Sequence, residues 1–491
     1  YLVAYILSPK EYAKLSKQLS KGNLELNVSD SAIKSHFRTG TRTFLGGYSL
    51  LTVVDAFSLL RSRRSKRAAL SKSDILSLLL SRKNAKCAGS LILLIALYQS
   101  VLFSERKLLG RIESLLPPSR RLRRLRKRLR ATTGLLRSKP ITALIAGLVA
   151  GLALVIQPDD HRRSIIALYS SIKAMETIIN HAKDNGMLNW RPSWLNTQFF
   201  FAISTGQLLY TFFFDNDCCP ETFSRMMKRF SSGFIPARPP SYSKNLPWPD
   251  KDAIISKLSS LPRARYPQFQ SPMLSEGKRT IPPVYSDVEP VLRIAHPAIT
   301  TMYSAITHPF EPSSFKNATE HSLSTLTQVS KLMSIAYGVL YLFRTVVSRQ
   351  SFSLDQKVQM LLQLIRSSAF ASLFLSISWV GGDLSQYILS NNRLPLYRFR
   401  LIGFIAGLAG YIDDSKVNRG LYIYTIRSAI YSYWRQLVKY KAVHPLPNGD
   451  VLLFAVSLGI IMGVYERSPR AVSSPTARKV LNVIKSGSFS D

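Results

Sequence analysis

Gly147-Leu-Val-Ala-Gly-Leu-Ala153 and Gly403-Phe-Ile-Ala-Gly-Leu-Ala409 are two copies of one pattern, 256 residues apart in a chain of 491 residues. The register continues without a gap to Arg163 and Arg419, each of which is followed by a small residue. The chain therefore contains an internal duplication, and these two are its repeat arginines. On a helix, Gly and Ala at a spacing of three to four form a flat strip that another helix backbone can approach closely. The expected helix-packing positions are Gly147, Gly151, Gly403 and Gly407.

Apolar residues are gathered into eight blocks rather than spread evenly along the chain. Several approach the roughly 20 residues that a helix needs to cross a bilayer. A soluble helical protein can contain one or two such blocks, but eight of them, with Gly/Ala strips and flanking Arg or Lys, indicate a membrane protein. The predicted fold class is all-α: a multi-pass membrane protein with two pseudo-repeated bundles of about four helices each. The blocks are Phe44–Leu60, Cys87–Phe103, Ile141–Ile156, Trp194–Phe214, Val329–Val347, Phe370–Val380, Leu401–Ile412 and Val451–Tyr465.

A Pro-rich linker is expected to join the two bundles. Residues 215–327 hold 15 of the 26 prolines, and proline interrupts long helices. Each half ends with one more span, Trp194–Phe214 or Val451–Tyr465, followed by a basic amphipathic segment. The predicted organisation is an N-terminal segment at 1–30, expected to be truncated because it begins without Met; a first membrane repeat at 31–214 with a basic insertion at 61–140; the linker at 215–327; a second membrane repeat at 328–466; and a basic C-terminal tail at 467–491.

The net charge of +38 is concentrated in the basic insertion, where residues 61–140 hold 22 Lys or Arg and three acidic residues. A charge so placed between spans is typical of a loop that faces a cytosol-like compartment and anionic lipid headgroups. Nucleic-acid binding would require an independent soluble unit, and the intervening spans argue against one. The basic flanks of Cys87–Phe103 conflict with a single crossing, so a re-entrant or peripheral helix is expected there.

Within the insertion, Leu122, Leu125 and Leu129 fall on one helical face with cations all round. This pattern favours a helix lying on an anionic membrane surface; a solvated charge run and a nuclear-import patch are the alternatives. The expected partners are therefore membrane lipids at this loop and proteins at the linker, with no nucleic acid. The basic residues are Arg120, Arg121, Arg123, Arg124, Arg126, Lys127, Arg128 and Arg130.

Five ionisable residues fall inside the predicted spans. Charges at that depth usually face a bundle interior, a pore or a partner, so they mark either buried ion pairs or a transport pathway. Arg38 and Arg366 each precede an aspartate by 17 residues, which places the two charges of each pair near opposite ends of a span. The intramembrane polar residues are Asp55, Lys173, Glu176, Asp383 and Arg427.

The sequence offers no catalytic constellation. No histidine has metal-ligand spacing, and there is no P-loop, dinucleotide fingerprint or nucleophile elbow. The three cysteines cannot form a disulfide framework, and vicinal Cys218-Cys219 lacks metal-ligand spacing. The chain is therefore expected to be no enzyme, with no catalytic, cofactor or metal site.

The duplicated hairpin resembles the glycine-rich hairpin of the Tim translocase and peroxisomal membrane protein superfamily. Two such hairpins in one chain, with Arg162–Tyr169 and a later Glu176, look like the transmembrane protein 135 family, fungal branch. Residues 293–297 and 307–317 are similar to the His-Pro and Asn-bearing cysteine-rich segment of that family, with serine and other residues in place of its cysteines. The resemblance implies a multi-pass protein of peroxisomal or mitochondrial membranes, associated with organelle division and lipid handling, and no known reaction.

These observations give two hypotheses of function. The first is a non-enzymatic organelle membrane protein that organises membranes or handles lipid. The alternative is a transporter or translocase-like conduit, whose polar path between the repeats would be lined by the intramembrane polar residues. Pairing of those residues favours the first hypothesis, and a shared cavity favours the second.

Overall fold

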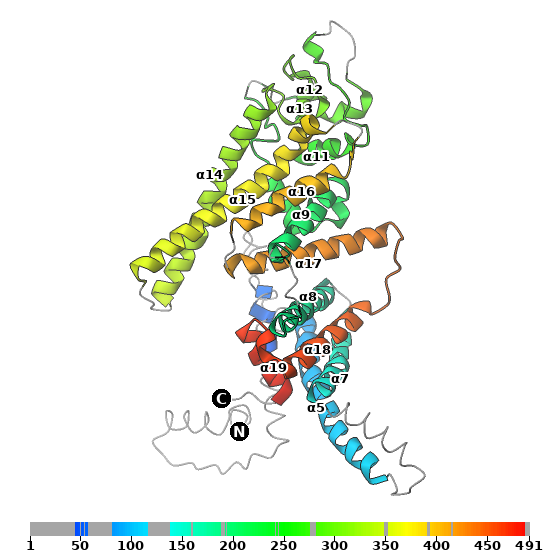
Figure 1. The fold of residues 1–491 in the computed structure, drawn as a ribbon. Coiled ribbons are helices and arrows are strands. Elements are labelled where there is room, and N and C mark those ends of the chain that lie inside the picture. The colour runs from blue at the N-terminus through cyan, green and yellow to red at the C-terminus, as the bar shows by residue number, and fades with distance from the viewer. Residues whose placement is uncertain are drawn as a thin grey trace. The chain divides into compact units, whose positions relative to one another are not determined.

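The computed structural model contains helices and turns but no β-strand in the residues it describes, so the predicted all-α class is confirmed (Figure 1). The only β pairing among those residues is two isolated bridges. The described residues are 45–49, 51–53, 55–56, 81–115, 138–158, 161–187, 192, 194–240, 242–243, 245–274, 281–347, 352–389, 393–413 and 416–486. The predicted segment 1–30, Arg38 and the basic run 120–130 lie outside them.

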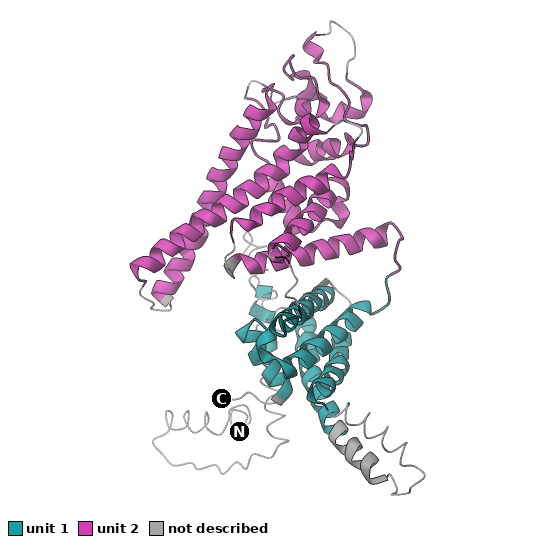
Figure 2. Ribbon diagram, in the orientation of Figure 1, with its two compact units in different colours: residues 1–190, 445–491 teal, residues 191–444 magenta. Residues whose placement is uncertain are grey.

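The chain forms two compact units that do not follow its two halves (Figure 2). Unit 1 combines residues 1–190 with 445–491, and unit 2 is residues 191–444. The described helices of unit 1 are α5 (Arg82–Leu115), α7 (Lys139–Gly151), η2 (Leu152–Ile156), α8 (His161–Asp184), α18 (Gly449–Arg467), η8 (Pro469–Ala471) and α19 (Pro475–Ser486).

Unit 2 consists of four long helices, a shorter one and a group of small helices in the predicted linker. Its main helices are α9 (Thr197–Phe214), α14 (Ser314–Leu342), α15 (Leu354–Ile388), α16 (Arg398–Leu408) and α17 (Lys416–Lys439). The others are η3 (Asn216–Cys218), α10 (Glu221–Arg229), α11 (Lys251–Ser260), η4 (Pro272–Leu274), η5 (Pro283–Val288), α12 (Glu289–Arg293), α13 (Met302–Thr307), the π-helix η6 (Phe343–Val347) and η7 (Ala409–Tyr411).

In unit 1, the glycine strip of the first hairpin packs on the last span of the chain. A Cβ atom on Gly147 of α7 would lie 2.8 Å from Cα of Gly459 on α18, and one on Gly151 would meet Ala455. Gly459 is equally close to α7, since its own Cβ would lie 2.9 Å from the Leu144 carbonyl oxygen. Two small-residue strips therefore meet face to face, and the backbones of α7 and α18 come into contact.

Unit 2 repeats this packing with a helix from the other half of the sequence. A Cβ atom on Gly403 of α16 would lie 2.7 Å from Cα of Gly206 on α9, and one on Gly407 would lie 2.5 Å from Cα of Ala202. The hydroxyl group of Thr205 donates a hydrogen bond across this contact to the Gly403 carbonyl oxygen at 2.8 Å. The hairpin of the first half thus packs on α18 from the second half, and the hairpin of the second half packs on α9 from the first half. The predicted domain boundaries at 214 and 328 place each of these helices in the other unit.

The segment predicted to be a linker is folded into unit 2 instead. Some of its prolines stand at helix starts: Pro220 occupies the N-cap position of α10, and Pro290 lies in the first turn of α12, where a missing N–H costs little. Between them, apolar side chains are buried in one core with α9, α15 and α16. These buried residues include Phe223, Met227, Phe234, Ile254, Leu258, Val288 and Leu292. Burial of this apolar surface drives the segment to fold despite its proline content.

Within the described residues, five helices are by length and composition apolar enough to cross a membrane, which indicates a multi-pass integral membrane protein. Cys87–Phe103 lies within the first of them, so by length and composition it fits a span rather than the expected peripheral helix. The block Leu401–Ile412 falls on α16, whose 11 residues extend only about 16 Å. The five candidate spans are Arg82–Ser104, Lys139–Ile156, Ser314–Val346, Leu354–Ile388 and Gly449–Arg467.

Candidate functional site

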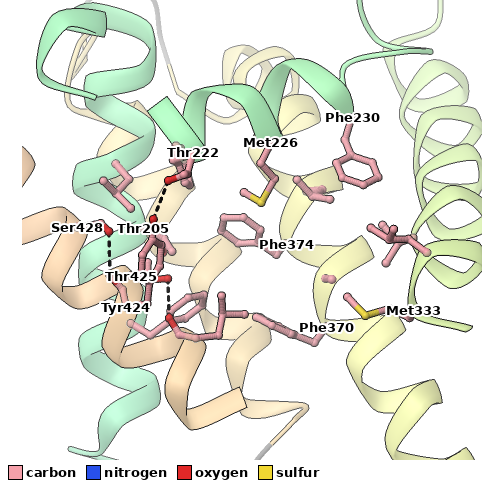
Figure 3. A pocket seen from close by; sticks show the side chains of 18 residues that line it. Thr205, Thr222, Met226, Phe230, Met333, Phe370, Phe374, Tyr424, Thr425 and Ser428 are labelled. Carbon is pink, nitrogen blue, oxygen red and sulfur yellow. Dashed lines mark hydrogen bonds between the residues drawn. The ribbon is translucent and has the colours of Figure 1, made fainter. Parts of the chain in front are cut away.

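An apolar pocket with a volume of about 350 Å³ lies inside unit 2 (Figure 3). Helices α9, α10, α14, α15 and α17 all contribute side chains to it. Twelve of its 18 lining residues are Phe, Leu, Met or Val, and none carries a charge. The lining residues are Phe201, Thr205, Leu208, Thr222, Phe223, Met226, Phe230, Val329, Leu332, Met333, Phe370, Ala371, Phe374, Leu375, Leu421, Tyr424, Thr425 and Ser428.

Local sequence signals place these helices. The Asn196 side chain accepts a hydrogen bond from the Phe199 N–H at 3.1 Å and starts α9. A capping box between Ser353 and Gln356 starts α15. Helix α10 is amphipathic, since Phe223, Met226 and Phe230 line the pocket while the opposite face carries Glu221 and Arg225. The sequence shows this helix as a basic amphipathic segment, and the structure turns its apolar face into the pocket.

The few hydroxyl groups of the pocket are already hydrogen-bonded. Those of Thr425 and Ser428 donate to the carbonyl oxygens of Leu421 and Tyr424, each at 2.9 Å (Figure 3). The hydroxyl groups of Thr222 and Tyr424 bond to each other at 2.8 Å. The wall therefore presents methyl groups and aromatic rings, which suit a hydrocarbon and offer no group for acid–base or nucleophilic chemistry.

The intramembrane polar residues of unit 1 are paired. The Asp55 carboxylate lies 2.5 Å from an Arg162 guanidinium nitrogen and accepts a hydrogen bond from the Asn84 amide at 3.0 Å. Lys173 and Glu176 form an ion pair at 2.8 Å, one helical turn apart on α8. These charges are thus compensated within the helices that carry them or by a neighbouring helix.

In unit 2, Asp383 of α15 is buried and bound to residues of the predicted linker. It accepts a hydrogen bond from the Ser304 hydroxyl at 2.8 Å, and Nε2 of His308 lies 3.0 Å from its other oxygen. Nδ1 of His308 lies 2.6 Å from the Glu311 carbonyl oxygen, which can only accept. Both ring nitrogens face acceptor oxygens, an arrangement that favours the protonated imidazole beside an ionised Asp383.

The pKa of His308 supports this assignment. Burial disfavours the charged ring, but the hydrogen bond and negative charge of Asp383 outweigh it and raise the pKa above the usual 6.5. Sequence reasoning missed this pairing, because it noted the histidine only as part of a His-Pro step in the linker.

Arg427, the remaining intramembrane residue, lies beside the pocket rather than in its wall. Its guanidinium carbon is 4.8 Å from the centroid of the Tyr424 ring, which lines the pocket. Among the described residues, no carboxylate lies within ion-pair distance of it. Four of the five residues are thus paired within their own units, and Arg427 stands beside the apolar pocket of unit 2.

The two repeat arginines have different surroundings. Arg163 forms an ion pair with Asp450 at 2.6 Å, and their side chains are 5% and 16% exposed. This pair ties α8 to the start of α18 in unit 1. Arg419, at the corresponding place on α17, is exposed. Position 197, which corresponds to Asp450 when the strips on α9 and α18 are aligned, is threonine, so unit 2 does not have the same pair.

No group of three or more His, Cys, Asp or Glu residues within the described ranges could hold a metal ion. The three cysteines are free thiols, and burial raises the pKa of Cys219 to about 12, which disfavours the nucleophilic thiolate. Searches of family models, of curated proteins and of solved structures gave no match to this chain.

Proposed function

We propose that this chain is a non-enzymatic multi-pass organelle membrane protein that organises the membrane and handles lipid. The observation that supports this proposal is that the buried charges of Asp383 and His308 in unit 2 lie outside the pocket. Asp383 is buried and bound to His308 and Ser304, whereas the pocket is lined by uncharged, mainly apolar side chains. A hydrophobic pocket with one cation at its edge suits an amphiphile better than a polar solute.

A conduit would need the intramembrane polar residues to face a shared cavity. Four of the five pair within their own units instead, and this pairing favours the first hypothesis over a transporter or translocase. The resemblance of the duplicated hairpins to the transmembrane protein 135 family supports a peroxisomal or mitochondrial membrane as the location. The basic run 120–130 would contact anionic headgroups on the side of that membrane where it emerges.

The test is membrane integration combined with flux. The full chain, expressed with a tag in its host cell, should resist alkaline carbonate extraction, be released by detergent, and fractionate with peroxisomes or mitochondria. Reconstituted in liposomes, it should release no small polar dye. Extraction by carbonate alone would contradict the membrane assignment. Dye release that disappears in a Lys173→Met, Glu176→Gln variant would support the conduit instead.

A further inference from the structure

We propose that the pocket of unit 2 binds one acyl chain of an anionic membrane phospholipid, with Arg427 beside its headgroup. This proposal rests on the proposed function and names the lipid class and the site. A volume of about 350 Å³ is at the small end of the range for ligand pockets, and an apolar lining without charge suits a stretch of a single acyl chain.

The pocket opens between α14 and α17. Most lining residues are buried, but Leu332 on α14 is 38% exposed, and Leu421 and Tyr424 on α17 are 46% and 40% exposed. These residues belong both to the wall and to the surface, so they mark the mouth. A chain that entered here would pass over apolar side chains and reach the buried rings of Phe201 and Phe374.

The surface next to this mouth faces hydrocarbon if α14 crosses the bilayer. Helix α14 is a candidate span with only 11% of its most apolar window buried. Its exposed residues beyond the pocket include Ile335, Val339 and Leu342. An apolar surface of this length is stable against lipid and costly against water. It gives the second acyl chain of a phospholipid a place to lie, and this favours a two-chain lipid over a free fatty acid.

The polar edge of the mouth fits a headgroup. The Thr222 and Tyr424 hydroxyl groups bond to each other there, and the Arg427 guanidinium stands over the Tyr424 ring. The aromatic face attracts the cation but carries no net charge, and among the described residues no carboxylate pairs with Arg427. A phosphate group would supply the charge and the acceptors that a guanidinium binds in a forked geometry. A lipid that enters from the bilayer already has its acyl chain out of water, so the hydrophobic effect does not distinguish one lipid from another. Selection among lipids must therefore come from the shape of the pocket and from the charge of Arg427.

The test is photolabelling of the full chain in nanodiscs. The probe is phosphatidylglycerol with a diazirine in one acyl chain, and labelled peptides are mapped by mass spectrometry. Labels should concentrate at 329–333 and 370–375 and saturate as the mole fraction of probe rises, whereas labels on exposed α14 residues rise in proportion. Ala371→Phe, which fills the pocket, should reduce the pocket labels about tenfold. The matched control Leu373→Phe, on the exposed face of α15, should leave them unchanged.

The headgroup is tested with a phosphatidylcholine probe and with Arg427→Gln. The substitution should reduce pocket labelling by the phosphatidylglycerol probe several-fold and leave labelling by the phosphatidylcholine probe unchanged. Pocket labels that do not saturate in the wild-type protein would overturn the proposal. So would stronger labelling by a free diazirine fatty acid than by either phospholipid. Carbonate extraction of the same samples reports membrane integration separately, so failure of the pocket and failure of the proposed function give different results.

Discussion

Replacing Gly407 by Ala should force α16 and α9 apart. The new Cβ would lie 2.5 Å from Cα of Ala202, whereas ordinary contacts begin at 3.4 Å, so the helices must separate by about 1 Å. Overpacking of this kind costs about 1–3 kcal/mol. Loss of the Thr205 hydrogen bond to Gly403 adds ~1 kcal/mol, and the better helix propensity of Ala offsets about as much. The net destabilisation of unit 2 is therefore about 1–3 kcal/mol.

Gly338 provides the matched control, because no atom lies within 4 Å of a Cβ built there on α14. Gly338→Ala should be neutral or stabilise by about 0.5–1 kcal/mol. In detergent, Tm should fall by about 2–12 °C for Gly407→Ala and stay level or rise for Gly338→Ala. Static light scattering or intrinsic fluorescence can follow the melt. If Gly407→Ala melted at or above the wild-type temperature, close packing of α16 on α9 would be refuted.

Three further predictions concern charged groups. His308 has a pKa above its unfolded value, so the stability it contributes is present below about pH 6.5 and lost as pH rises through the folded pKa. Tm should therefore fall as pH rises above about 6.5, and an Asp383→Asn variant that kept the same slope would contradict this. Arg163→Met leaves Asp450 without its ion-pair partner and should lower the free energy of unfolding of unit 1 by about 3 kcal/mol. Adding Asp450→Asn should restore part of this loss, and equal Tm values for the single and double variants would show that the two residues are not coupled. Replacing the cations of 120–130 by Gln should weaken flotation of a 104–140 peptide with anionic vesicles, and unchanged flotation would show that charge is not the cause.

The sequence predicts the glycine strips but not the helices that fill them. The strips Ala202/Gly206 and Ala455/Gly459 are 253 residues apart at both positions, so either could pack on either hairpin. Small residues specify close approach, and they carry little information about which partner approaches. The exchange of third spans is decided by the rest of each interface and by chain connectivity, which a repeat pattern does not show.

The pocket could not be predicted for a related reason. It is built from ordinary core side chains on five helices, and none of them belongs to a motif. One wall of the pocket comes from the proline-rich stretch, whose proline content predicts a linker rather than a folded part of a unit. The spacing of Phe223, Met226 and Phe230 in the same stretch instead predicts a buried helix face. Among the candidate spans of the described residues, only α15 carries one of the five residues predicted to be intramembrane, Asp383. Its partner His308 depends on the folding of that same proline-rich stretch.

The exchanged spans set an order in time for synthesis. The described helices of unit 2 have all been synthesised once α17 ends at Lys439. In unit 1, α7 can pack on α18 only after α18 has been synthesised, and α18 begins 298 residues after Gly151. At about 5–20 residues per second, the ribosome needs about 15–60 s to supply it. During that interval the first glycine strip has no helix against it and is open to chaperones or to a wrong neighbour. A chain cut short after residue 444 would complete its second unit and never its first.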